Sequence, residues 1–541
     1  MIKDNWKINL QGRNLPTLQI INRIAQHRGI DAIPDFLFPG VEHINDPSAF
    51  KNIEIASAIV SSGIKDKKNF LIYADVDADG CTSAAIIYHY IKAFDIEPKL
   101  HINIGKAHGV QEDFNINSYG NIDIVIIVDS LNSTMKEYHK ILATGAEIVI
   151  LDHHVPSEEI LKNQKVLALV SSSNDYPNPH LTGSGVCWQF IRYVDKEFNT
   201  GIHNQLADLA AVGIIGDAGC VGIESMENRA ICNLGFSNVS NLGLYTLVKS
   251  DTMCSSTIGY SVAPLINAAN RMEDNWPALT LFTTNSEYEA NQVIKILEGH
   301  KVAQRAIVEK VFSEFDDMVI GQEDNLCYVF KVSNCKNLSG LLATKAVDKY
   351  GKPCLVVTES EDAYHGSMRS TKTEDFRLMI NNTRLAQCDG HENSAGITIP
   401  KENLDLLISI LNSELSGYEF TADIPIDVQI SRNQITPMLL DSIATYNRIT
   451  GHGFGEIKIL IDGIMDYSIR KLADGKHLSV ELPDMKFLKW NFNDWNNVLE
   501  NSELSAIGTL SVNTFMGKKT VQMIMEDYQF SDTTSTNNLF F

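Results

Sequence analysis

The sequence predicts an α/β protein whose largest domain is a doubly wound parallel sheet. Three apolar segments, 70–74, 122–129 and 146–152, are short, rich in β-branched residues and separated by stretches compatible with helices. Strands that are buried on both faces of a parallel sheet have this composition. Two of the segments end in Asp, and functional groups of open α/β sheets gather at the carboxyl ends of the strands.

The size and composition are those of a multidomain soluble protein. The 541 residues exceed what one hydrophobic core holds, so about two to four domains are expected. The segment "MIKDNWKINL" lacks the apolar core of a signal peptide, and no apolar run approaches the ~18 residues that cross a bilayer. Nine cysteines without a CxxC pair argue against a disulfide framework. We therefore expect a cytoplasmic protein.

The net charge bears on the class of partner. A formal charge of -22 argues against a nucleic-acid partner, because Lys and Arg drive binding to phosphates. For an enzyme this exclusion is weak, since a local basic groove and bound cations can coexist with an acidic exterior.

The helix and strand patterns divide the chain into successive units. One long helix that links two domains, about 45 Å in length, is predicted by an apolar stripe whose members are Val293, Leu297, Ile307, Val311 and Phe315. The expected units are an N-terminal helical segment at 1–65, the main α/β domain at 66–280, the connecting helix at 285–320, a smaller α/β domain at 325–417, a β-rich domain at 420–530 and a flexible tail at 531–541.

Three carboxylates, Asp75, Asp77 and Asp79, alternate directly after the first strand of the main domain. Together with Gly80 they match the start of a calcium-binding EF-hand loop, but the twelfth position, where Glu is required, is Ile86. A strand rather than a helix also precedes the loop, so the EF-hand interpretation is disfavoured. Taken alone, the segment would also fit solvated Asp side chains in a turn.

Further acidic and imidazole side chains follow at comparable positions. Asp129 ends the second apolar segment, and His153 and His154 follow Asp152 at the end of the third. Asp217 lies in the apolar, Gly-rich stretch "LAAVGIIGDAG", where a carboxylate without a partner would be costly. Four acidic sites in one α/β domain are best explained by divalent cations. Oxygen ligands with one or two imidazoles favour Mn²⁺ or Mg²⁺ over zinc.

The ordered motifs resemble those of the RecJ single-stranded-DNA exonucleases, within the DHH phosphoesterase superfamily. "ADVDADGCTSAA", "VDS", "LDHH" and "AVGIIGDAG" match four metal motifs in order. "LLATKAVDKYGKPCLVV", "HGSMRS" and "CDGHENSAGITI" resemble a DHHA1 substrate-binding domain, and "DGKHLSVEL" with "GKKTVQMIMED" resembles the RecJ OB-fold. The resemblance implies a DHH domain at 66–280, a smaller α/β DHHA1 domain joined to it by the long helix, and a C-terminal OB-like domain.

The resemblance implies a role for each residue of the metal site. Asp75 and Asp77 would hold one metal ion, and Asp129 would bridge the two ions. The second ion would take Asp79, His153 and Asp217. The second histidine of the triplet, His154, would contact the scissile phosphate or orient the metal ligands.

The resemblance also implies substrate contacts. Ser367 and Arg369 would grip a 5′-terminal phosphate, Gly390 and His391 would lie at a backbone phosphate, and Arg271 would face the cleft. The chain departs from the family in two of these motifs, since the family's Gly-Gly-His reads Asp389-Gly390-His391 and its Pro-Asn-Arg…Gly-Tyr-Gly stretch appears as "NIGKAHGV". Lys106 or His108 would then supply the basic contact of the second motif.

The function implied is metal-dependent 5′-to-3′ hydrolysis of single-stranded DNA by two Mn²⁺ or Mg²⁺ ions, in DNA recombination or repair. A monomer is implied, with a single-stranded-DNA-binding protein or a helicase as protein partner and no membrane. Four aromatic residues are candidates for base stacking or, equally, for the OB core: Phe487, Trp490, Phe492 and Trp495. The alternatives are a nanoRNase or cyclic-dinucleotide phosphodiesterase of the same superfamily and a non-catalytic DNA-binding scaffold.

Overall fold

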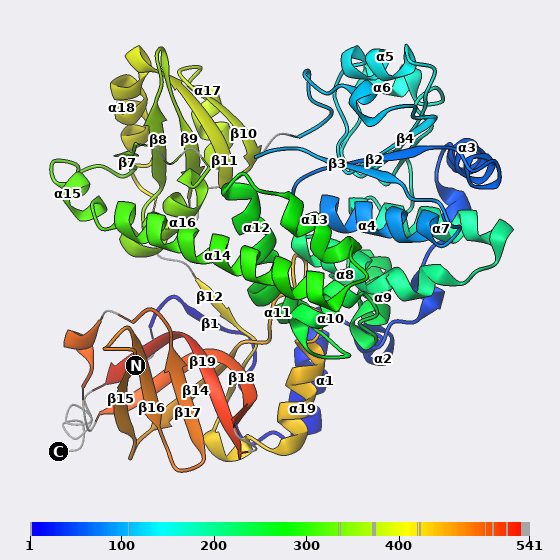
Figure 1. The fold of residues 1–541 in the computed structure, drawn as a ribbon. Coiled ribbons are helices and arrows are strands. Elements are labelled where there is room, and N and C mark those ends of the chain that lie inside the picture. The colour runs from blue at the N-terminus through cyan, green and yellow to red at the C-terminus, as the bar shows by residue number, and fades with distance from the viewer. Residues whose placement is uncertain are drawn as a thin grey trace, which may run out of the picture.

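Three large sheets, a two-stranded sheet and a helical layer make up the computed structural model (Figure 1). The structure describes residues 3–105, 108–333, 335, 337–370, 375–418, 420, 423–492, 494–499, 502–515 and 518–531. Apart from Ser531, the expected flexible tail at 531–541 lies outside these residues. Among the described helices, none is long and apolar enough to cross a membrane.

The first sheet is parallel and has the order β3-β2-β4-β5-β6. Its strands are β2 (Phe70–Ala74), β3 (Lys99–Ile102), β4 (Ile124–Val128), β5 (Glu147–Asp152) and β6 (Leu169–Ser171). Every residue of β2 and β4 is buried, as the continuous apolar segments predict.

Helices cover both faces of this sheet (Figure 1). One face packs against α3 (Ile53–Lys65), α4 (Ala78–Lys92) and α7 (Gly183–Phe198), and α8 (Ala207–Gly216) and α9 (Met226–Ser237) pack behind them. The other face packs against α5 (Lys136–Leu142) and α6 (Glu158–Asn163). The prediction of a doubly wound α/β domain is therefore confirmed.

A helical layer connects the first sheet to the second. It comprises α10 (Leu242–Val248), α11 (Ser255–Thr257), a π-helix at Ile258–Val262, α12 (Ala263–Arg271), α13 (Trp276–Thr283) and α14 (Glu287–Phe312). The long helix α14 contacts α10, α12, α13 and, at its far end, α16 (Ser339–Tyr350). Its predicted apolar stripe is wrong at two positions. Ile307 is 36% exposed, while its neighbour Val308 is buried, and Phe315 lies beyond the end of the helix, in α15 (Phe315–Val319).

The second sheet is mixed and has the order β10-β11-β9-β8-β7. Its strands are β7 (Tyr328–Lys331), β8 (Cys354–Glu359), β9 (Ala363–Arg369), β10 (Gln387–His391) and β11 (Ser394–Pro400). Only the pairing of β7 with β8 is parallel. The helices of this unit are α15 (Phe315–Val319), α16, α17 (Phe376–Asn382) and α18 (Leu404–Glu414).

The third sheet contains seven strands in the order β13-β14-β18-β19-β17-β16-β15. They are β13 (Val428–Ile430), β14 (Ile459–Ile464), β15 (Ser468–Leu472), β16 (His477–Glu481), β17 (Met485–Lys489), β18 (Glu503–Phe515) and β19 (Lys518–Ser531). Helix α19 (Pro437–Tyr446) packs beside β18.

The sequence predicts a helical N-terminal segment, but the structure shows that this segment is not purely helical. Strand β1 (Trp6–Ile8) pairs in parallel with β12 (Ile424–Ile426), more than 400 positions along the chain. Helix α1 (Thr17–His27) then packs on α19, in a core shared with the third sheet, and Phe36 of α2 (Ile33–Leu37) belongs to the same core. The hydrophobic pattern of neither segment indicates that the two strands pair, so the sequence could not predict this contact.

The four aromatic candidates for base stacking separate by burial. Phe487 and Phe492 are 0% and 5% exposed and belong to the core of the third sheet, so the stacking interpretation is wrong for them. Trp490 is 48% exposed beside His477. Trp495 lies half-buried, with the Lys471 ammonium 4.6 Å from its ring centroid.

Candidate active site

The carboxyl ends of β2, β4 and β5 bring three acidic residues to one edge of the first sheet. Ala74 pairs with Val128, and Val128 pairs with Leu151, so the next residues, Asp75 and Asp129, and the final residue of β5, Asp152, are neighbours. The parallel register alone places these side chains together, because each follows its strand at the same level.

The first ligand group consists of Asp75, Asp77 and Asp129. One carboxylate oxygen from each lies within 4.8 Å of the others. Asp77 also caps α4, where it accepts a hydrogen bond of 2.9 Å from the Gly80 amide. A side chain at Gly80 would lie 2.5 Å from the Asp75 carbonyl oxygen, so the tight turn that brings Asp75 and Asp77 together requires glycine.

The second ligand group consists of Asp79, His153 and Asp217, again with ligand atoms within 4.8 Å of one another. Asp217 follows the last residue of α8. His153 joins the two groups, because its Nε2 lies 3.2 Å from Asp129 Oδ1 and 3.6 Å from Asp217 Oδ2. A third possible group consists of Asp129, His153 and His154, and it shares Asp129 with the first group and His153 with the second.

Helix α7 holds Asp79 in place. The carboxylate accepts hydrogen bonds from the Gly183 amide at 2.6 Å, the Ser184 amide at 3.0 Å and the Thr182 hydroxyl at 3.0 Å. The positive end of the α7 dipole therefore faces this carboxylate. A Cβ at Gly183 would lie 2.8 Å from the Asp129 Cβ, so glycine lets the helix end approach both ligand groups.

Burial and mutual repulsion make the carboxylates costly without counter-ions. Burial, with the charges of Asp75 and Asp79, raises the pKa of Asp77 to about 7. Burial and the charge of Asp79 raise the pKa of Asp217 to about 7 as well. The pKa of Asp129 also lies well above its usual value, chiefly because the side chain is buried.

Asp129 carries a further mark of a cation site. Its Oδ1 is buried and accepts no hydrogen bond from the described residues. A cation would satisfy the oxygen and neutralise the cluster. Oxygen donors with one or two imidazoles suit Mn²⁺ or Mg²⁺, so the residues present fit the implied metal ions.

Asp152 is a candidate functional residue whose role its position in the sequence did not specify. Its Oδ1 accepts hydrogen bonds from the amides of His153 and His154, both at 2.7 Å, and from His154 Nδ1 at 2.8 Å. Burial opposes a charge on His154, but the contact with Asp152 outweighs burial and raises the pKa of His154 to about 9. The signal in the sequence was available, because an Asp ends the third apolar segment.

The basic candidates meet where the helical layer faces the second sheet. Arg271 ends α12, and its Nη1 lies 3.4 Å from Gln304 Oε1 on α14. Burial and the nearby charge of Arg271 lower the pKa of Arg369 on β9. Ser367 Oγ lies 2.9 Å from Ser339 Oγ at the start of α16. Two guanidinium groups and two hydroxyls thus come together from separate elements.

A groove of about 480 Å³ includes Ser367, Arg369 and Asp389 in its lining. Gly390 and His391, the next residues of β10, are not among its lining residues, and His391 is exposed. His108 instead lies at the first ligand group, with its Nδ1 2.8 Å from Asp75 Oδ2. Lys106 lies outside the described residues.

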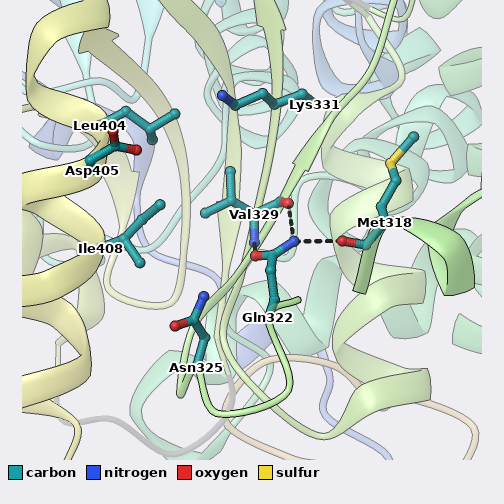
Figure 2. A pocket seen from close by; sticks show the side chains of 8 residues that line it. All are labelled: Met318, Gln322, Asn325, Val329, Lys331, Leu404, Asp405 and Ile408. Carbon is teal, nitrogen blue, oxygen red and sulfur yellow. Dashed lines mark hydrogen bonds between the residues drawn. The ribbon is translucent and has the colours of Figure 1, made fainter. Parts of the chain in front are cut away.

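A separate pocket of about 320 Å³ lies beside β7 in the second sheet (Figure 2). Gln322 crosses it and bonds to the backbone of Met318 and Val329, while Asp405 and Ile408 of α18 face it from the other side. None of the described candidate residues lines this pocket, so it is distinct from the carboxylate cluster.

Two segments of this chain match known protein families. Residues 69–214 match the DHH family, N-terminal domain, and residues 426–527 match the RecJ OB domain. Two segments of the chain thus match a DHH-family domain and a RecJ OB domain, and the resemblance found in its motifs is confirmed.

The relatives matched over most of the chain include RecJ proteins. The single-stranded-DNA-specific exonuclease RecJ of Bacillus subtilis is 25% identical over 98% of this chain and 70% of the relative. RecJ of Thermus thermophilus is 23% identical over 88% of this chain and 71% of the relative. The crystal structure of Thermus thermophilus RecJ in complex with Mn²⁺ has the same fold, with a TM-score of 0.78 and 20% identity. The structural match covers 98% of this chain and 80% of the Thermus thermophilus chain.

Proposed function

We propose that the protein is a metal-dependent exonuclease that degrades single-stranded DNA from its 5′ end, in DNA recombination or repair. The observation that carries this proposal is the pair of adjoining ligand groups at the carboxyl edge of the first sheet. The matched relatives named as single-stranded-DNA-specific exonucleases support it.

Two divalent cations would fit the two ligand groups. Asp75, Asp77 and Asp129 would hold one, and Asp79, His153 and Asp217 the other. Bound Mn²⁺ or Mg²⁺ lowers the pKa of a coordinated water and stabilises developing charge on a phosphodiester. Asp152 holds the His154 ring through Nδ1, which leaves the opposite ring nitrogen free to donate a hydrogen bond to a phosphate oxygen.

The polar and basic residues where the helical layer faces the second sheet would determine the end of the DNA strand from which cleavage begins. Arg271, Ser367 and Arg369 offer charged and hydroxyl donors to a 5′-terminal phosphate, and a strand held there would extend toward the carboxylate cluster. Gly390 and His391 would contact the next backbone phosphate. The carboxylate of Asp389 lines the same groove and would weaken the grip on a dianionic end.

End-resolved digestion tests the proposal. Single strands labelled at the 5′ or the 3′ end are incubated with the protein and Mn²⁺, with EDTA as the metal-free control. We expect the 5′ label to be released first, as a mononucleotide or short product, and no cleavage in EDTA. Release of the 3′ label first would refute the polarity.

The alternatives predict different substrates. A nanoRNase or cyclic-dinucleotide phosphodiesterase would hydrolyse short RNA but not a 50-nucleotide DNA strand. The RecJ OB domain at 426–527 favours the longer substrate. A non-catalytic scaffold would cleave neither substrate. Such a protein would not need metal ligands, whereas every predicted metal ligand of this chain belongs to a possible metal-binding group.

The cellular setting is part of the same proposal. All nine cysteines are free, which fits a reducing compartment such as the cytoplasm. A monomer that works with a single-stranded-DNA-binding protein or a helicase would suit an enzyme that needs unpaired DNA. Light scattering and pull-down with each purified partner test these two points.

A further inference from the structure

His108 occupies a position over the first ligand group. Its Nδ1 lies 2.8 Å from Asp75 Oδ2, and because a carboxylate only accepts, the ring must donate this hydrogen bond. Its ring centroid lies 4.5 Å from that of His154, whose Nδ1 is held by Asp152. His108 therefore contacts two residues of the candidate active site.

The segment that carries His108 is fixed to the strand ends. Gly109 has φ of 78°, and its amide donates to Ser130 Oγ at 3.1 Å. The Val110 amide donates to Asn132 Oδ1 at 2.7 Å, and Asn132 Nδ2 donates back to the Val110 carbonyl at 2.9 Å. Ser130 and Asn132 lie one and three positions after the ligand Asp129, so the segment that follows this ligand also positions His108.

Both oxygens of Asp75 are engaged by the protein. Oδ1 accepts from the Val76 amide at 2.8 Å, and Oδ2 accepts from His108. Each carboxylate oxygen has a second lone pair, so these bonds orient Asp75 and leave it able to bind a cation. Hydrogen-bond partners of this kind set the orientation and affinity of metal ligands.

We propose that His108 is a positioning residue that holds Asp75 in its metal-binding orientation. This inference rests on the proposed function, because it takes Asp75 to be a metal ligand. It assigns His108 to the metal centre rather than to the DNA backbone. Its hydrogen bond should favour Mn²⁺ binding at the group formed by Asp75, Asp77 and Asp129, with little effect at the group around Asp217.

Two substitutions separate the hydrogen bond from the ring. His108→Asn keeps a donor nitrogen at nearly the same distance from the backbone but removes the ring. His108→Phe keeps a ring over His154 but removes the donor. His300→Phe is the matched control, because His300 Nε2 makes an equally short contact, 2.8 Å, with Asp274 outside the carboxylate cluster.

Mn²⁺ binding to the full chain, measured without DNA by titration calorimetry and electron paramagnetic resonance, tests the proposal. We expect His108→Phe to weaken one of two Mn²⁺ sites by about 10- to 100-fold, while His108→Asn and His300→Phe bind nearly as the wild type does. Circular dichroism and thermal unfolding in EDTA establish that each variant folds.

Two results would overturn the proposal: unchanged Mn²⁺ affinity in a folded His108→Phe variant, or an equal loss in His108→Asn. The wild-type digestion assay judges the exonuclease proposal separately. If the wild type binds two Mn²⁺ ions and cleaves no DNA, the exonuclease proposal fails while the role of His108 can still be measured.

Discussion

Replacing Asp77 by Asn should stabilise the metal-free protein at neutral and alkaline pH. The carboxylate caps α4 through the Gly80 amide, and Asn is an equally good N-cap residue, so the helix end is preserved. What the substitution removes is the charge that Asp75 and Asp79 repel. The effect therefore isolates the electrostatic cost of the cluster.

The magnitude follows from the raised pKa. The pKa of Asp77 rises from 3.8 to about 7, and each pH unit corresponds to ~1.36 kcal/mol, so the cost at pH 8 has an upper limit of about 4 kcal/mol. Neighbouring carboxylates share this repulsion and the site can relax, so we expect a gain of about 1–3 kcal/mol for Asp77→Asn.

The pKa values of Asp77 in the unfolded and folded states also determine whether stability rises or falls with pH. The unfolded chain releases this proton near pH 4, whereas the folded metal-free protein keeps it until about pH 7. Between these values the folded state binds more protons, so its stability falls as the pH rises. The variant should therefore match the wild type near pH 4 and exceed it progressively up to pH 7.

Urea unfolding in EDTA at several pH values measures the difference, and added Mn²⁺ should reverse the order, since the variant has lost a ligand. Asp375→Asn is the matched control, because Asp375 also caps a helix but has a lowered pKa owing to Arg377, so its loss should give no gain at pH 8. An Asp77→Asn variant that is less stable than the wild type in EDTA at pH 8 would refute the reasoning.

Three further perturbations have defined outcomes. Asp389→Gly removes a negative charge from the groove beside Arg369 and should tighten binding of 5′-phosphorylated over 5′-hydroxyl strands by about fivefold, equivalent to ~1 kcal/mol; an unchanged ratio of Kd values would contradict this. Gly183→Ala would place a methyl group 2.8 Å from the Asp129 Cβ and should reduce kcat by about 100-fold. An unchanged kcat would contradict this prediction, because it would show that the two groups can move apart without displacing the metal ligands. Asp152→Asn should lower the pKa of His154 in the metal-free protein from about 9 toward ~6.5, as followed by NMR titration, and an unshifted resonance would exclude Asp152 as the cause.

The sequence predicted the first sheet and the position of its carboxylates because both depend on local patterns. The segments around Ile72, Ile126 and Val149 are apolar on both faces, a composition typical of buried parallel strands. Parallel register then dictates that Asp75 and Asp129 meet. The grouping of ligands into two sets needed the family resemblance, since no local pattern specifies it.

Other features depend on contacts between distant segments. The three donors that hold Asp79 come from residues more than 100 positions away, at the start of α7. The pairing of β1 with β12 is equally remote. Among the aromatic residues near 490, composition could not separate the buried Phe492 from the exposed Trp490, because both fit an edge of a β-sheet.

The most direct test of the account is the location of bound manganese. A crystal of the wild-type protein grown with Mn²⁺ and measured at the manganese absorption edge would reveal each ion by its anomalous scattering. We predict two peaks, one coordinated by Asp75, Asp77 and Asp129 and the other by Asp79, His153 and Asp217. A single peak away from these side chains, or none at saturating Mn²⁺, would contradict it.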